Sequence, residues 1–177
     1  MKLSEEMKEW IKDIGLSVVC AMLILTFLKP IIVKQHSMEN TLHQNDYLFV
    51  SRQAYRLFGE PERGDIIVFS SEMTTETGKN KNLIKRIIGL PGDTVSIFDG
   101  VTYINGEALD EPYTKDGYTL GDMDAVTVPE GMLFVMGDNR QNSADSRSAL
   151  VGMVDQKTVM GKAVFRLFPF SRIGGLE

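Results

Sequence analysis

The sequence has few of the side chains on which most metal sites and disulfides depend. Its 177 residues include one cysteine, Cys20, and two histidines, His36 and His43. A single cysteine excludes an intramolecular disulfide, so the fold must hold without one even in an oxidising compartment. With no clustered histidine or cysteine spacing, we expect no zinc site. Neither histidine has an obvious triad partner nearby, so a Ser-His-Asp arrangement has only weak support.

Basic residues are outnumbered by acidic residues. Nineteen lysines and arginines face 24 acidic residues, which gives a formal net charge of -5. The protein as a whole therefore has no electrostatic reason to bind nucleic acid, and we expect none as a partner. Apolar residues make up 43% of the chain, enough for the core of one ordinary domain.

An uncharged apolar run near the N-terminus predicts a membrane anchor. Residues 14–28 carry no charge, and apolar residues resume after Lys29-Pro30 and continue to Val33. A helix needs about 20 mostly apolar residues to cross a bilayer, and Lys29 can reach the headgroups by snorkelling. We predict a short cytoplasmic tail at 1–13, a single transmembrane anchor at 14–33 and an extracytoplasmic domain at 34–177.

Other interpretations of this run have less support. A cleaved secretory signal needs a small-x-small site, which 26–30 do not offer, and a lipoprotein signal needs a small residue before Cys20, where Val19 stands. A buried helix of a soluble domain remains the alternative. The positive-inside rule favours a cytoplasmic N-terminus because three lysines precede the run: Lys2, Lys8 and Lys12.

The rest of the chain reads as short β-strands. Asp99-Gly100 and Asn105-Gly106 are strong two-residue hairpin turns. Two polar segments, 72–82 and 110–124, are expected to be exposed loops. We predict an all-β fold, an antiparallel barrel or sandwich-like domain behind one N-terminal transmembrane helix. The expected strands lie at 47–50, 66–69, 83–88, 94–98, 101–104, 126–128, 133–136 and 159–165.

Ser37 and Lys85 are the most informative pair of residues. A serine hydroxyl is a poor nucleophile until a base takes its proton. A lysine can be that base only when neutral, which requires its pKa of about 10.4 to fall by roughly 2 to 3 units. Burial among apolar residues produces shifts of that size. On residue types alone, Ser37 is as readily a turn residue and Lys85-Arg86 a surface charge pair.

The strings around these residues resemble the type I signal peptidases, membrane-bound serine/lysine peptidases that remove signal peptides from exported proteins. The resemblance covers nearly the whole chain and is closest to the compact form found in Gram-positive bacteria. Its motifs occur in order at 37–42, 63–69, 85–93, 128–131, 135–140 and 143–147.

The resemblance implies a role for each matching residue. Ser37 matches the nucleophile, Lys85 the general base and Ser143 the serine that orients the lysine amine. A salt-bridge group that braces the site is matched by Arg86, Asp138, Asp145 and Arg147. Matching candidates for the walls of the substrate pocket are Val33, Met38, Leu42, Leu83 and Ile84.

The oxyanion hole is where this sequence departs from the family pattern. The family uses the backbone N–H of the serine, here Ser37, and longer members add a hydroxyl two positions earlier. Gln35 occupies that position, where compact members commonly have glycine. His36 replaces a small residue or proline, and Asn40 replaces a proline. The Gln35 side-chain amide is therefore an uncertain second donor.

The resemblance implies a membrane-bound serine endopeptidase that cleaves the signal peptides of exported preproteins after small residues. It needs no metal or organic cofactor, and its expected partners are signal peptides, the lipid bilayer and the protein export machinery. The alternative is a catalytically impaired relative that binds signal peptides without cleaving them. Self-cleaving repressors use a similar dyad, but they carry a DNA-binding region where this chain has its apolar run.

Overall fold

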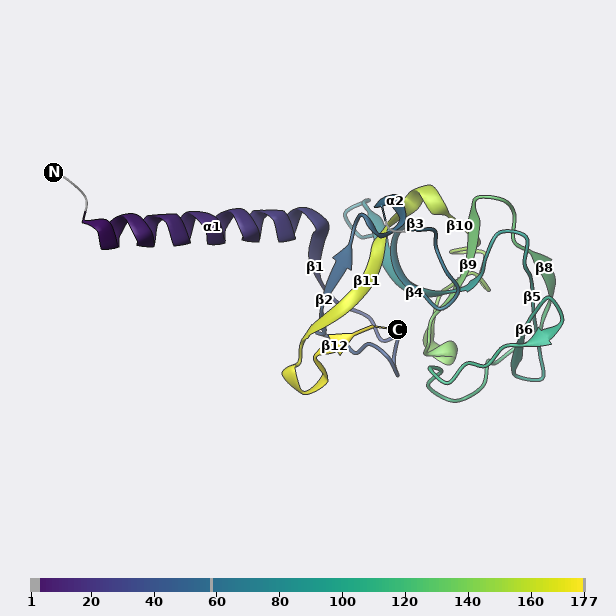
Figure 1. Ribbon diagram of the computed structural model, residues 1–177. Coiled ribbons are helices and arrows are strands. Elements are labelled where there is room, and N and C mark those ends of the chain that lie inside the picture. The colour runs from purple at the N-terminus through teal and green to yellow at the C-terminus, as the bar shows by residue number, and fades with distance from the viewer. Residues whose placement is uncertain (1–3, 58, 177) are drawn as a thin grey trace.

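A long N-terminal helix is followed by a β domain of two antiparallel sheets (Figure 1). The structure is a computed structural model and describes residues 4–57 and 59–176. The predicted fold class, antiparallel all-β with one apolar N-terminal helix, is confirmed. Seven of the eight expected strand segments lie within strands, and the eighth, 126–128, extends one residue beyond the end of β8 at Thr127.

The larger sheet carries most of the strands. In spatial order it contains β1 (Leu28–Ile32), β2 (Tyr47–Ser51), β11 (Val159–Phe168), β3 (Ile66–Thr74), β4 (Asn80–Gly89), β9 (Met132–Met136) and β10 (Val154–Asp155), with β12 (Gly174–Gly175) paired to β11. The smaller sheet contains β7 (Glu107–Ala108), β6 (Val101–Ile104), β5 (Thr94–Phe98) and β8 (Met123–Thr127). The short helical segments are α2 (Ala54–Leu57), η1 (Arg140–Asn142), η2 (Gln156–Thr158) and η3 (Phe170–Arg172).

The two predicted hairpin turns close the smaller sheet. Asp99 and Gly100 have φ of 47° and 78°, and Asn105 and Gly106 have φ of 54° and 85°. Positive φ at both central residues is what a type I′ turn requires, and this turn matches the twist of the flanking strands. The turns join β5 to β6 and β6 to β7.

The helix α1 (Glu5–Phe27) is shorter at its C-terminal end than the predicted anchor at 14–33. The hydroxyl of Ser4 caps it by accepting from the Met7 N–H. After Phe27 the chain turns into β1, so 28–32 belong to the sheet and not to the helix. Pro30 explains the difference because it disfavours helix at the preceding residue, and because its missing N–H is tolerated on an edge strand.

α1 is long and apolar enough to span a membrane, with a mean hydropathy of 1.8. None of its most apolar window is buried within the protein, and it extends away from the β domain (Figure 1). The alternative of a buried core helix is therefore wrong.

The polar segment at 72–82 is not the loop that we expected. β3 continues to Thr74 and β4 begins at Asn80, so only 75–79 form the turn. The Ser71 hydroxyl donates to the Lys81 carbonyl across the hairpin. This hairpin extends beyond the core, and its polar side chains face solvent on both sides. That exposure is why the alternating apolar signal fades there. The other expected loop, 110–124, ends where β8 begins at Met123.

β4 positions the candidate site because it lies between β3 and β9 in the larger sheet. Ile67 of β3 is the register partner of Lys85, and Met136 of β9 is the partner of Arg86. Both faces of β4 are buried here, with Ile87 and Ile88 fully inaccessible to solvent. Two adjacent polar residues on this strand are therefore carried into the interior on opposite sides.

Candidate active site

Ser37 and Lys85 meet inside the domain although they are 48 residues apart in sequence. The Lys85 Nζ donates a hydrogen bond to the Ser37 Oγ at 2.5 Å. Lys85 is 1% exposed and Ser37 is 6% exposed. The serine lies in the turn that follows β1, and the lysine lies in the middle of β4. The structure thus brings the two residues together as the sequence predicted.

The surroundings of Lys85 favour its neutral form. Burial lowers the pKa of Lys85 to about 8, against the opposing effect of the Asp145 and Asp138 carboxylates. The positive charge of Arg147 lowers it a little further. A lysine with such a pKa is partly neutral near pH 8, and a neutral amine can accept the proton of a serine hydroxyl.

The loop that carries Ser37 is held in place by the segment after β9. The Asn139 N–H donates to the Ser37 carbonyl at 3.0 Å, and the Asn139 side-chain amide donates to the His36 carbonyl at 3.0 Å. Gly137 packs so closely against the Ser37 carbonyl and Ser143 that a Cβ there would collide with both. Sequence reasoning missed these supports, although Gly137-Asp138-Asn139 stands within one of the motif strings.

Arg86 and Asp138 form a buried ion pair behind the site. Two parallel hydrogen bonds join them, Nε to Oδ1 at 2.9 Å and Nη2 to Oδ2 at 2.8 Å. Their side chains are 2% and 0% exposed. The Thr41 hydroxyl also donates to Asp138 at 2.5 Å, and the Tyr113 ring lies 4.0 Å from the guanidinium carbon. Removing one partner of such a pair leaves an unpaired buried charge at a cost of about 3 to 5 kcal/mol.

Asp145 and Arg147 form a second pair, with Nε 2.8 Å from Oδ1. Burial alone would raise the pKa of Asp145, but hydrogen bonds from Arg147 and from the Gly137 N–H outweigh it and hold the pKa below its ordinary value. Within 4–57 and 59–176 no hydrogen bond or ion pair joins the side chains of this pair to those of Arg86 and Asp138. The predicted charge group therefore exists as two pairs, connected through the Gly137–Asp138 backbone.

Ser143 lies beside the site but does not make the contact that we expected. Its Oγ is buried and forms no hydrogen bond with the Lys85 amine. Its hydroxyl interacts with the Asp145 carboxylate, and this interaction helps to lower the pKa of that carboxyl group. The amine is instead positioned by its own strand and by the bond to Ser37.

A cavity of about 370 Å³ opens beside the Ser37 hydroxyl and the Lys85 amine. Gln35 and Leu83 line it, together with Met73 and Ala144, which sequence reasoning missed. Ser37 and Lys85 both line this cavity, so a substrate carbonyl placed in it has access to the Ser37 hydroxyl.

A larger groove of about 860 Å³ adjoins this cavity and shares Lys34, Gln35 and Leu83 with it. Of the predicted wall residues, three line it: Val33, Leu83 and Ile84. The other two predicted wall residues, Met38 and Leu42, line neither space. Both are 0% exposed and pack in the core against the strands, because the turn after β1 directs them inward.

A buried serine hydroxyl bonded to a lysine amine of lowered pKa, beside an open cavity, is an arrangement suited to a serine hydrolase with a lysine base. The sequence profile described as "Signal peptidase, peptidase S26" matches residues 7–168. The chain therefore belongs to the signal peptidase family, peptidase S26.

Individual relatives agree with this assignment. The chain is 46% identical over 175 residues to a signal peptidase I of Bacillus licheniformis, with 93% of this chain and 90% of the relative covered. It is 40% identical over 176 residues to signal peptidase I S of Bacillus subtilis (strain 168), with 93% and 91% covered. A crystal structure of a signal peptidase I from Enterococcus faecalis V583 is 39% identical and covers 58% of this chain and 96% of its own, with a TM-score of 0.48.

Proposed function

We propose that the protein is a membrane-bound endopeptidase that removes signal peptides from exported preproteins by cutting after a small residue. The observation that carries the proposal is the 2.5 Å hydrogen bond between the buried Lys85 amine and the Ser37 hydroxyl. Both residues line a cavity that a substrate can enter. Family membership supports the substrate class. The candidate span α1 supports attachment to the membrane.

The proton transfers and the nucleophilic attack of the proposed reaction use the side chains of Ser37 and Lys85. The neutral Lys85 amine takes the proton of Ser37 as its Oγ attacks the carbonyl carbon of the scissile bond. The tetrahedral intermediate expels the new amino terminus, which receives the proton from Lys85. Water then attacks the resulting ester, gives its proton to Lys85, and the Ser37 oxygen leaves and regains a proton. The signal peptide departs with a free carboxylate, and no metal or cofactor takes part.

The Ser37 backbone N–H is the proposed donor to the oxyanion. It makes no hydrogen bond elsewhere in residues 4–57 and 59–176, so it is free to meet a developing negative charge. Gln35 is the candidate for the second donor because it is exposed, lines the cavity and makes no side-chain hydrogen bond to another described residue.

Gln35→Ala tests this second donor. If the amide stabilises the oxyanion, kcat should fall about 100-fold with little change in KM, since such a donor acts in the transition state. Steady-state kinetics on a preprotein provide both constants. An unchanged kcat would leave the Ser37 N–H as the sole proposed donor.

Membrane attachment would place the site near the point where α1 meets the β domain. We propose that α1 spans the bilayer with its N-terminus in the cytoplasm and that the domain following it lies on the extracytoplasmic side, next to the protein export machinery. Because β1 follows α1 directly, the turn carrying Ser37 begins only a few residues beyond the end of the proposed span. The enzyme and a substrate that emerges from the same bilayer would then meet by diffusion along the membrane surface, which raises their effective concentration.

The proposal is tested by incubating the detergent-solubilised full chain with a preprotein and determining the amino terminus of the product by mass spectrometry. We expect one cut, directly after a small residue, that an alanine-to-tryptophan change before the cut abolishes. Binding of the signal peptide with no cleavage at any pH between 6 and 10 would reject the proposal in favour of the catalytically impaired relative.

A further inference from the structure

Most of the lysines and arginines that the structure describes after α1 without an ionic partner line one groove. Eight other described lysines and arginines after α1 form salt bridges. Apart from Lys85, the basic side chains after α1 that the structure describes without a salt bridge are Lys29, Lys34, Arg52, Lys79, Lys81 and Lys157. The first five all line the larger groove beside the active-site cavity, and only Lys157 does not.

We call these five side chains (Lys29, Lys34, Arg52, Lys79 and Lys81) the cationic rim. No aspartate or glutamate among the residues that the structure describes lines the groove with them, in a protein whose formal net charge is -5. Glu76 lies in the turn of the same β3–β4 hairpin but does not line the groove. Uncompensated like charges repel one another, so this arrangement favours an anionic occupant.

The floor of the groove favours a peptide as that occupant. Val33, Val50, Val68 and Leu83 line it and are all at least nine-tenths buried. β1 lies at the edge of the larger sheet and forms part of the same wall, so an extended chain could pair with its backbone. The groove also adjoins the cavity that Ser37 lines, because the two spaces share Lys34, Gln35 and Leu83. An occupant that enters the active site from this side therefore passes under the cationic rim.

We propose that the cationic rim selects substrates that carry a carboxylate in the segment before the scissile bond. Lys34 lies next to the catalytic cavity, and Lys29 is five residues further back along β1, or roughly 17 Å of extended chain. A substrate strand of the same length places the selected carboxylate about four to six residues before the cut. This inference rests on the proposed function for its direction of substrate entry, and it adds a charge preference to the choice of a small residue at the cut.

The test uses three preproteins that differ only in one residue, glutamate, glutamine or lysine, five positions before the cut. We expect kcat/KM to fall in the order Glu, Gln, Lys, with about a fivefold difference at each step, as exposed ion pairs allow. The difference should shrink in high salt because these charges are exposed to solvent. In the K79E/K81E double variant the summed charge of the rim falls from +5 to +1, so the preference for Glu over Lys should shrink strongly or vanish.

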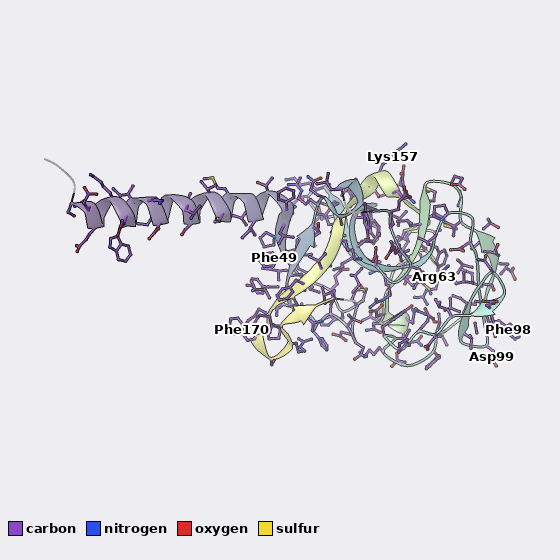
Figure 2. The ribbon with its side chains drawn as sticks, viewed as in Figure 1. Phe49, Arg63, Phe98, Asp99, Lys157 and Phe170 are labelled. Carbon is purple, nitrogen blue, oxygen red and sulfur yellow. The ribbon has the colours of Figure 1, made fainter. Side chains whose placement is uncertain are left out.

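Lys157→Glu is the control, because it makes a single lysine-to-glutamate change at an exposed lysine on η2 (Figure 2) that does not line the groove. It should keep the wild-type preference, whereas the single variant K81E, which makes the same charge change within the rim, should weaken the preference. Equal kcat/KM of the wild type for the Glu and Lys substrates would overturn the inference, and so would a K157E variant that weakens the preference as much as K81E does.

Two further measurements distinguish this inference from a failure of the proposed function and from binding of lipid headgroups. Affinities of the three labelled signal peptides for the Ser37→Ala form should follow the same order, so the charge preference is measured even if no cleavage occurs. A preference that appears only on vesicles of anionic phospholipid, and not in neutral detergent, would assign the rim to lipid headgroups and overturn the peptide proposal.

Discussion

Ser37→Ala and Lys85→Ala should each lower kcat by roughly 10⁴-fold or more, because the variant lacks either the nucleophile or the base. The bond between the two side chains makes them one catalytic unit. The double variant should therefore be no slower than either single variant. Cleavage of a preprotein followed by gel or mass spectrometry measures all three.

A further variant distinguishes loss of catalysis from loss of folding. Lys85→Met removes the amine but keeps most of the side-chain volume in a site that is 1% exposed, so it should fold at least as well as the wild type and still be inactive. Lys157→Met makes the same change at an exposed lysine and should keep full activity. Wild-type cleavage by the Ser37 or Lys85 variants would reject the assigned pair.

The rate of cleavage should rise steeply with pH and level off above pH 8. Burial lowers the pKa of Lys85 to about 8, so the reactive neutral form is a small minority in acid and dominates above that pH. Below the pKa the neutral fraction falls tenfold per pH unit, which predicts about a 50-fold rise in kcat/KM between pH 6 and pH 8. A pH–rate profile of the solubilised enzyme measures this rise.

Substituting the charged neighbours of Lys85 should shift the midpoint of the pH–rate profile in a predictable direction. The Asp145 carboxylate raises the pKa of Lys85 and the Arg147 guanidinium lowers it. Asp145→Asn should therefore move the midpoint of the profile to lower pH, and Arg147→Gln should move it to higher pH. Lys157→Gln should leave it in place. A wild-type rate that is constant from pH 5 to 9 would contradict a lysine base.

Local sequence patterns were sufficient for most of the β elements and for the burial of Lys85, whereas the pairing of Lys85 with Ser37 was implied by the family resemblance. The Asp99-Gly100 and Asn105-Gly106 turns specify their hairpins through local backbone preferences, which the structure confirms. The role of a base requires Lys85 to be buried among apolar residues, and in the expected strand at 83–88 it is 1% exposed. In both places the signal lies within a few neighbouring residues.

The features that sequence reasoning missed depend on contacts between distant segments. Asn139 holds the Ser37 loop across about 100 residues of sequence, and no local pattern encodes that pairing. The anchor was predicted to extend too far toward the C-terminus because Ile31, Ile32 and Val33 are as apolar as a membrane helix, although they serve as strand and core. Met38 and Leu42 were placed in the pocket because proximity to Ser37 in sequence does not reveal which side of the turn faces the core.

The most direct measurement is the titration of the Lys85 amine itself. In the full chain with isotope-labelled lysine, the Lys85 resonance can be assigned by its loss in Lys85→Met and followed by NMR from pH 6 to 11. The account predicts a midpoint near 8. A Lys85 midpoint at the ordinary value near 10.5 would show a charged amine at physiological pH and contradict the proposed mechanism.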